Sequence, residues 1–144
     1  MQRPQHRDSL GPAGADMDRG MTEAQLHKSV AQYLALALPK DAVWTTVGHG
    51  GGGKVRGAQL KARGLRAGWP DVQIIFRGKF YGIELKGPNG RLSPEQIACA
   101  KSIVDAGGDY TRAHAVSEVE DWLRLLRFPL RASSGPARKR ARAV

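Results

Sequence analysis

The sequence has little cysteine, no long apolar run and few acidic residues. A single cysteine, Cys99, excludes an internal disulfide and a thiolate zinc cluster, and it fits a reducing compartment. No apolar run approaches the roughly 20 residues of a membrane span, and the first 20 residues lack the apolar stretch of a secretory signal. We therefore expect a small cytoplasmic protein. Acids number 13 against 23 Lys and Arg, a net charge of +10, which favours polyanionic partners.

The excess positive charge is concentrated in two segments. Residues 131–144 contain five Lys and Arg and no acid, which is half of the excess. Residues 48–69 contain five more and again no acid: Lys54, Arg56, Lys61, Arg63 and Arg66. Cationic segments of this kind are typical of proteins that bind phosphate-rich partners. A basic tail that only keeps the chain solvated is the alternative for residues 131–144.

The length of the chain, 144 residues, corresponds to one domain. Residues 1–20 are rich in Pro, Gly, Arg and Asp, and residues 131–144 are basic and poor in apolar side chains. Both segments are predicted to be disordered tails. The folded domain is then expected at residues 21–130.

The folded domain is predicted to contain both helices and strands. Apolar residues at helical spacing, with their caps, predict helices from Thr22 to Pro39, over 55–63, from Ser93 to Gly107, and from Ser117 to Pro129. Runs rich in β-branched and aromatic residues predict strands at 43–47, 72–76, 80–86 and 110–114. Arg77-Gly78-Lys79 is the expected hairpin turn between the middle two. This order indicates an α/β fold with a mixed sheet.

A glycine run precedes the cationic segment at 48–69. Residues 48–54, GHGGGGK, match the G-x-x-x-x-G-K pattern of a phosphate-binding P-loop. The next residue, Val55, lacks the hydroxyl that would hold Mg²⁺ there, and a sheet built around a hairpin differs from a parallel nucleotide-binding sheet. We therefore favour a basic loop over a nucleotide site, and His49 within it is either a phosphate contact or solvated.

Two carboxylates and a lysine are expected to meet at one end of the hairpin. Side chains alternate along a strand, so Glu84 and Lys86 point to the same face. A turn around residues 78–79 would set Asp71 opposite residue 85 or 86, within cross-strand reach of Glu84. Paired carboxylates can hold Mg²⁺, which polarises a phosphoryl oxygen and acidifies a bound water. The set predicts phosphodiester hydrolysis, and an ordinary Glu–Lys pair on an exposed hairpin is the alternative.

Four neighbouring residues extend this hypothesis. Glu23 lies in the first turn of the first helix, on the face expected to be buried, and is either a helix-end acid or a third carboxylate for the metal. Gln96 fits a capping box, with an active-site role as the alternative. His27 follows Glu23 by one turn, but one histidine makes no zinc site, so we expect it at the surface. Trp69 adjoins the metal motif and is expected to pack under it or reach substrate.

These motifs and their spacing resemble the virus-type replication-repair nuclease (VRR-NUC) domain of the PD-(D/E)XK superfamily. The matching pieces are a Gly-x-Pro-Asp strand start, a Glu-x-Lys strand end and a Leu-Ser-x-x-Gln helix start, at 68–71, 84–86 and 92–96. Glu23 matches the family's glutamate early in its first helix. The resemblance covers about residues 21–128. It departs from the family pattern at Trp69, where a smaller aliphatic residue is usual, and in the length of the glycine run.

The resemblance implies a restriction-endonuclease-like core in the order α-β-β-β-α-β. It implies that the metal ligands are Asp71, Glu84, the main-chain carbonyl of Leu85, and Glu23. Lys86 would direct the water or the phosphate, and we count Gln96 with this catalytic set. The cofactor is expected to be Mg²⁺, with Mn²⁺ chemically suitable as well.

The implied activity is that of a DNA endonuclease. The resemblance implies selectivity for branched DNA, four-way junctions included, and a homodimer. The five cations of residues 48–69 would then contact DNA phosphates. A module of the same fold that binds nucleic acid without cutting it is the alternative, and the intact set of Asp71, Glu84 and Lys86 disfavours it.

Overall fold

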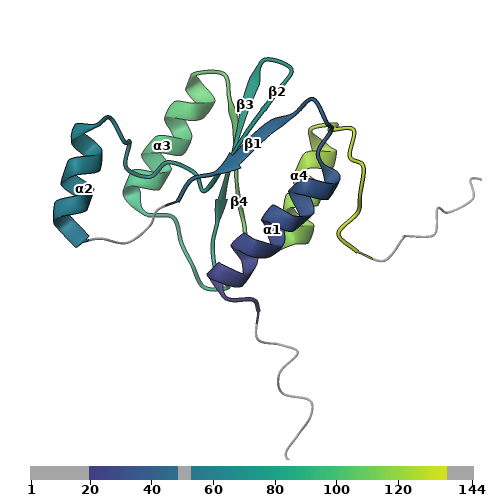
Figure 1. Ribbon diagram of the computed structural model, residues 1–144, viewed down its shortest axis with the longest axis horizontal. Helices are drawn as coiled ribbons and strands as arrows, with labels where there is room; N and C mark the ends of the chain where they lie inside the picture. The colour runs from purple at the N-terminus through teal and green to yellow at the C-terminus, as the bar shows by residue number, and fades with distance from the viewer. Residues whose placement is uncertain (1–19, 49–52, 136–144) are drawn as a thin grey trace, which may run out of the picture.

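The chain folds around a four-stranded sheet with helices on both faces (Figure 1). The computed structural model describes residues 20–48 and 53–135; the predicted tail before residue 20, most of the glycine run with His49, and the chain beyond 135 lie outside them. In chain order the elements are α1 (Glu23–Ala37), β1 (Val43–Thr46), α2 (Gly53–Ala62), β2 (Val72–Phe76), β3 (Lys79–Leu85), α3 (Pro94–Asp105), β4 (Asp109–Ala113) and α4 (Val116–Leu125). The predicted order and the α/β class are confirmed.

The sheet is mixed, in the order β1-β2-β3-β4. β2 runs antiparallel to both β1 and β3, and β4 runs parallel to β3 after the crossover through α3. The hairpin turn contains only Arg77 and Gly78, with φ of 49° and 77°. Such a turn matches the twist of the strands. It is one residue shorter than predicted, so Val72 pairs with Ile83, and the same register brings Asp71 level with residue 84 rather than 85 or 86.

The main core lies on the face of the sheet that α1 and α4 cover, while α3 covers the opposite face (Figure 1). Its fully buried side chains recur at helical spacing in α1 and α4 and at every second position in β2 and β3. They include Leu26, Val30, Leu34, Ile74, Ile83, Leu85 and Leu123. Because odd-numbered residues of β3 face this core, the even-numbered Glu84 faces the α3 side. The described helices include none that is long and apolar enough to cross a bilayer.

Two of the three predicted helix caps are confirmed. Thr22 and Ser93 each accept the N–H of the third helical residue and close a capping box, with Gln25 and Gln96 respectively. The cap predicted at Ser117 is wrong, because α4 begins at Val116, after an N-cap alanine that makes no side-chain cap bond. There the carboxylate of Glu118 instead accepts the N–H of His114, at 2.7 Å.

Residues 131–135 pack on the folded body, although the sequence assigned them to the C-terminal tail. The N–H of Arg131 donates to the carbonyl of Ala37 at 2.8 Å, and its Nε donates to the carbonyl of Leu38 at 2.7 Å. The N–H of Ser134 donates to Glu120 Oε2 at 2.9 Å. The folded part of the chain therefore extends past the predicted boundary at residue 130.

Candidate active site

Close packing fixes the segment that leads into Asp71. Gly68 has φ of +79°, and a Cβ there would lie 2.4 Å from the main chain of Glu95 at the start of α3. Pro70 is fully buried, and its Cγ lies 2.8 Å from where a Cβ on Gly82 would stand. Only glycine fits at either position. The Gly-x-Pro-Asp segment is therefore held between α3 and β3, with Asp71 directly before β2.

Asp71 and Glu84 carry buried carboxylates, 4 % and 2 % exposed. Asp71 Oδ2 accepts the N–H of Leu85 at 2.8 Å. Glu84 Oε1 accepts a hydrogen bond from Gln96 Nε2 at 2.6 Å, and Lys86 Nζ lies 3.5 Å from the same oxygen. Glu84 Oε2 is buried with no hydrogen-bond partner among the described residues. An unpaired buried carboxylate oxygen is costly, and a bound cation would offset that cost.

The Asp71 carboxylate also raises the cost of ionising Glu84. Burial, together with the charge of Asp71, raises the pKa of Glu84 from 4.5 to about 7, although the Lys86 ammonium acts in the opposite direction. Like charges held close together in a buried site favour the protonated form of one of them. A divalent cation between the two would remove this penalty, so the electrostatics of the pair fit a metal site.

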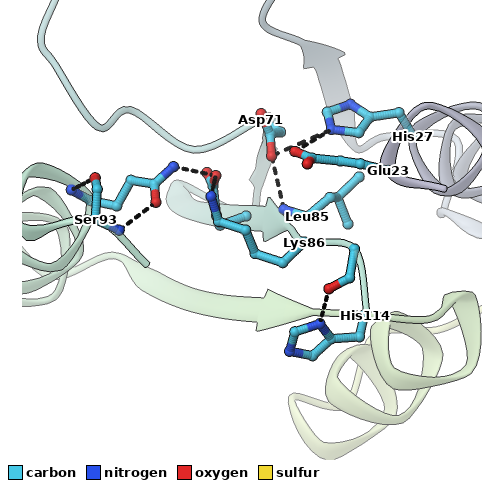
Figure 2. A network of polar contacts seen from close by, with 10 residues as sticks. Glu23, His27, Asp71, Leu85, Lys86, Ser93 and His114 are labelled. Carbon is cyan, nitrogen blue, oxygen red and sulfur yellow. Dashed lines mark hydrogen bonds and ion pairs between the residues drawn. The ribbon is translucent and has the colours of Figure 1, made fainter. Parts of the chain in front are cut away.

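The first two turns of α1 bring Glu23 and His27 to Asp71 (Figure 2). His27 Nε2 lies 3.6 Å from Asp71 Oδ2 and 3.9 Å from Glu23 Oε1. One donor atom from each residue lies within 4.8 Å of the others, so the three form a possible metal site. The Glu23 side chain is 54 % exposed, at the rim of the site rather than on the buried face that the sequence suggested.

His27, expected at the surface from the sequence, lies beside Glu23 and Asp71. Its side chain is about one-third exposed to solvent, and its ring faces the carboxylates of Glu23 and Asp71. The one available signal was the i,i+4 spacing from Glu23, which places both side chains on the same face of a helix. That spacing could not show that Asp71, from another element, lies beside them.

A missed residue, His114, holds the loop that follows Lys86. His114 Nδ1 lies 2.9 Å from the carbonyl oxygen of Gly87, and the N–H of Lys86 donates to the carbonyl of Ala113 at 3.0 Å. Since a carbonyl only accepts hydrogen bonds, Nδ1 carries the proton in this contact. Gly90 N–H donates to the same Gly87 carbonyl at 2.9 Å. The loop after the Glu-x-Lys strand end is thus tied to the end of β4 (Figure 2).

A cleft of about 930 Å³ opens onto the carboxylates. Its walls come from α1, the end of β1, the segment before Asp71, and the start of α3. Trp69 lines the cleft and packs its ring against Phe80, with centroids 5.5 Å apart. The indole therefore packs against β3 while it lines the cleft, and its expected role beneath the metal site or toward substrate stays a prediction.

The five predicted phosphate contacts lie on α2 or on the segment just after it, and all are exposed. Lys61 is the one among them that lines the cleft with the carboxylates. Arg56 and Arg63 border a separate hollow of about 340 Å³. An Arg66 guanidinium nitrogen donates to Ser102 Oγ at 2.8 Å, which ties this side chain to α3. The structure brings one of the five cations to the carboxylates and leaves the others farther out on the surface.

A mixed α/β sheet with two buried carboxylates and a lysine at the end of a hairpin, open to a cleft beside a cationic helix, is the arrangement of a nuclease-type domain. The family model of the VRR-NUC domain matches residues 23–117, and the chain belongs to this family.

Two solved structures support the fold. One, a "VRR_NUC domain protein", is 22 % identical over 74 % of this chain and 91 % of its own, with a TM-score of 0.57. Another, a "VRR_NUC domain", is 19 % identical over 75 % of this chain and 100 % of its own, with a TM-score of 0.50. At these identities the likeness shows the fold alone. Comparison with curated proteins finds no match.

Proposed function

We propose that this protein is a metal-dependent DNA endonuclease that hydrolyses phosphodiester bonds. The observation that carries the proposal is the pair of buried carboxylates, Asp71 and Glu84, with Lys86 Nζ 3.5 Å from Glu84 at the cleft of a VRR-NUC domain. A structural ion pair needs neither a second buried carboxylate nor an unpaired buried oxygen. A site for a cation and a phosphate accounts for both.

The ligands that we propose for the metal are Asp71, Glu84, the main-chain carbonyl of Leu85, and Glu23. Glu84 Oε2, buried without a hydrogen-bond partner among the described residues, supports its assignment. When bound, a divalent cation supplies a Lewis acid that neutralises charge on the scissile phosphate and acidifies water. Hard oxygen donors suit Mg²⁺, and the same donors also accept Mn²⁺.

Lys86 and Gln96 have different roles in this proposal. The Lys86 ammonium is positioned to stabilise negative charge that develops on the phosphate. Gln96 donates to Glu84 Oε1, while its own oxygen accepts the N–H of Ser93 at 2.8 Å. Both ends of the amide are therefore engaged, and Gln96 acts as a positioning residue that fixes the Glu84 carboxylate.

The proposed substrate is DNA, with branched DNA and four-way junctions preferred and a homodimer as the active form. The cationic surface beside the cleft supports a nucleic-acid partner, because phosphate contacts supply most sequence-independent affinity. A two-fold dimer would present two equivalent sites to two strands. The preference for branches and the dimer rest on the family resemblance.

A cleavage assay tests the proposal. Linear duplex, single-stranded, flapped and four-way-junction DNA would be incubated with the protein in Mg²⁺, Mn²⁺ or EDTA. Metal-dependent cutting is expected, with Glu84→Gln abolishing it and Lys86→Ala lowering kcat by about 100-fold or more. Asp105→Asn and Lys101→Ala, on the exposed face of α3, are matched controls that should cut normally.

Two outcomes would contradict the proposal. Cutting that survives Glu84→Gln would mean that the metal site is misassigned. Binding without metal-dependent cutting on any of these substrates would favour the non-cleaving module instead. Sedimentation of the free protein and of its junction complex tests the dimer separately.

A further inference from the structure

We infer that His27 is a direct ligand of the active-site metal and that its imidazole makes the site prefer Mn²⁺ over Mg²⁺. The inference rests on the proposed metal site, but it does not require that the protein cut DNA. It adds a nitrogen donor to a site that the sequence alone describes as entirely oxygen-based.

The distances around His27 fit coordination better than hydrogen bonding. Nε2 lies 3.6 Å from Asp71 Oδ2 and 3.9 Å from Glu23 Oε1, and hydrogen bonds to nitrogen donors are about 2.7–3.2 Å long. Metal bonds of about 2.1 Å separate adjacent donors by about 3.0 Å and opposite donors by about 4.2 Å. Both separations at His27 fall within that range, and one donor atom from each of the three residues lies within 4.8 Å of the other two, so small side-chain adjustments would bring all three to one ion.

The three donors are held in place by separate local contacts. The capping box between Thr22 and Gln25 fixes the start of α1, and therefore the position of Glu23 relative to His27 one turn later. Asp71 is fixed by the N–H of Leu85, which donates to the same Oδ2 that faces the imidazole. Figure 2 shows the His27 ring directed at Asp71, with Glu23 beside it. A site whose donors come from preordered elements binds a metal with little rearrangement.

The donor set determines which ion is favoured. Mg²⁺ prefers oxygen ligands in strict octahedral geometry and loses its water reluctantly. Mn²⁺ shares the carboxylate and water ligands of Mg²⁺, but as a softer first-row transition ion it binds an imidazole nitrogen more strongly than Mg²⁺ does. A site of Asp71, Glu23 and Glu84 alone would offer only carboxylates to either ion. The imidazole of His27 therefore stabilises bound Mn²⁺ more than bound Mg²⁺.

A purely electrostatic role for His27 predicts a different result. If the imidazole only paired with the carboxylates, its removal would change the affinities for Mn²⁺ and Mg²⁺ by similar factors. If the imidazole binds the metal, its removal lowers the affinity for Mn²⁺ much more than the affinity for Mg²⁺. The ratio of the two affinities separates these cases, and neither measurement involves DNA.

The experiment compares the full chain with His27→Ala and His27→Asn. Free Mn²⁺ is measured by electron paramagnetic resonance, and Mg²⁺ affinity follows from competition. We expect wild-type protein to bind Mn²⁺ more tightly than Mg²⁺, and His27→Ala to lose about 10–100-fold in Mn²⁺ affinity with a much smaller loss for Mg²⁺. Electron spin-echo modulation of bound Mn²⁺ should show coupling to ¹⁴N that both variants lack.

Gln32→Ala, on the exposed face of the same helix, is the control that should keep both the affinity and the nitrogen coupling. Position 27 is partly exposed, so both variants are expected to fold, which circular dichroism checks. The inference would be overturned if wild type showed no saturable Mn²⁺ binding or no nitrogen coupling. It would also be overturned if His27→Ala left both metal affinities unchanged or lowered the affinities for Mn²⁺ and Mg²⁺ by equal factors. A protein with nitrogen-coupled Mn²⁺ that cuts no DNA would retain the inference and lose the proposed function.

Discussion

At the residue scale, Glu84 links the chemistry of the site to the stability of the protein. Its pKa of about 7 in the fold compares with 4.5 for an ordinary glutamate, chiefly because the carboxyl is buried and secondarily because of Asp71. Between these two values the folded state holds a proton that the unfolded chain releases. Stability of the metal-free protein therefore falls as pH rises from about 4.5 to about 7.

This difference predicts a pH-dependent effect of Glu84→Gln. In EDTA, the variant should lack the fall in melting temperature between pH 5 and pH 7.5 and should be more stable than wild type above pH 7, because a neutral amide needs no proton. Thermal denaturation across this range measures it. Addition of Mn²⁺ at pH 7.5 should stabilise wild type more than the variant. Parallel pH profiles of wild type and variant would contradict the raised pKa, with Asp105→Asn as the control.

His114 is predicted to position Lys86 through the Gly87 carbonyl. His114→Ala should lower kcat by about tenfold, a loss typical of residues that orient an active-site group, with little change in KM. His114→Asn should recover most of the loss, because its amide nitrogen occupies nearly the place of Nδ1 and can donate to the same oxygen. Steady-state kinetics of both variants measures this. Equal losses in the two variants would contradict the hydrogen-bond mechanism.

The sequence was enough to predict that Asp71, Glu84 and Lys86 lie together, because alternation in a strand and a short hairpin leave few places for these side chains. The sequence could not predict the contact of His114, because its partner is the main-chain carbonyl of Gly87. Every residue has such a carbonyl, so no residue type marks the contact in the sequence. Gln96 illustrates an intermediate case. Its capping box follows from local spacing, whereas its bond to Glu84 depends on how α3 packs against β3.

At the element scale, α2 differs from the other helices. It contributes no side chain to the described hydrophobic core, and Val55 in its first turn is 74 % exposed. A short helix of this kind gains little from packing and is marginal alone in water. Its basic residues can therefore be changed with little effect on the fold, which makes it the best element for testing DNA binding.

The five predicted phosphate contacts are expected to contribute unequally. Lys61→Gln should weaken both DNA affinity and kcat/KM, because Lys61 lines the cleft. The double change Arg56→Gln with Arg63→Gln should mainly weaken binding, reducing the slope of log affinity against log salt by up to about 2. Arg66→Gln should have the smallest effect on binding, since Ser102 already holds that side chain.

Fluorescence anisotropy over a salt series in EDTA measures these slopes, and melting temperatures should stay near wild type. Lys101→Gln on α3 is the matched control for loss of one exposed positive charge. Equal slopes for all variants and the control would contradict a role of α2 in phosphate contact.

The elements themselves were largely predictable, since β2 matches its predicted bounds and the other elements differ by a few residues at their ends. The errors arose where competing local interactions decide the structure. At α4, Glu118 bonds to His114 and no serine cap forms. At the hairpin, positive φ at a non-glycine residue, Arg77, allows a turn one residue shorter than the sequence indicated.

At the scale of the whole molecule, residues 131–135 form hydrogen bonds with both α1 and α4 and so connect these two helices. Arg131 bonds to the end of α1, and Ser134 bonds to Glu120 of α4 through both its N–H and its hydroxyl. Burial alone would raise the pKa of Glu120, but the hydrogen bonds from Ser134 and Arg124 lower it to about 2. This carboxylate therefore stabilises the fold above about pH 4.5, and its contribution is lost as pH falls toward 2.

Two truncations separate this structural role from the charge of the remaining tail. A chain ending at 135 keeps the contacts of Arg131 and Ser134 but loses the four cations of residues 136–144. It should melt like the full chain, while its salt slope for DNA binding falls by at most about 4. A chain ending at 130 should have a similarly reduced slope and, in addition, a lower melting temperature. Its buried Glu120 carboxylate loses the hydrogen bonds from Ser134, which costs about 1–3 kcal/mol. Identical melting curves for the two truncations would contradict this role of residues 131–135.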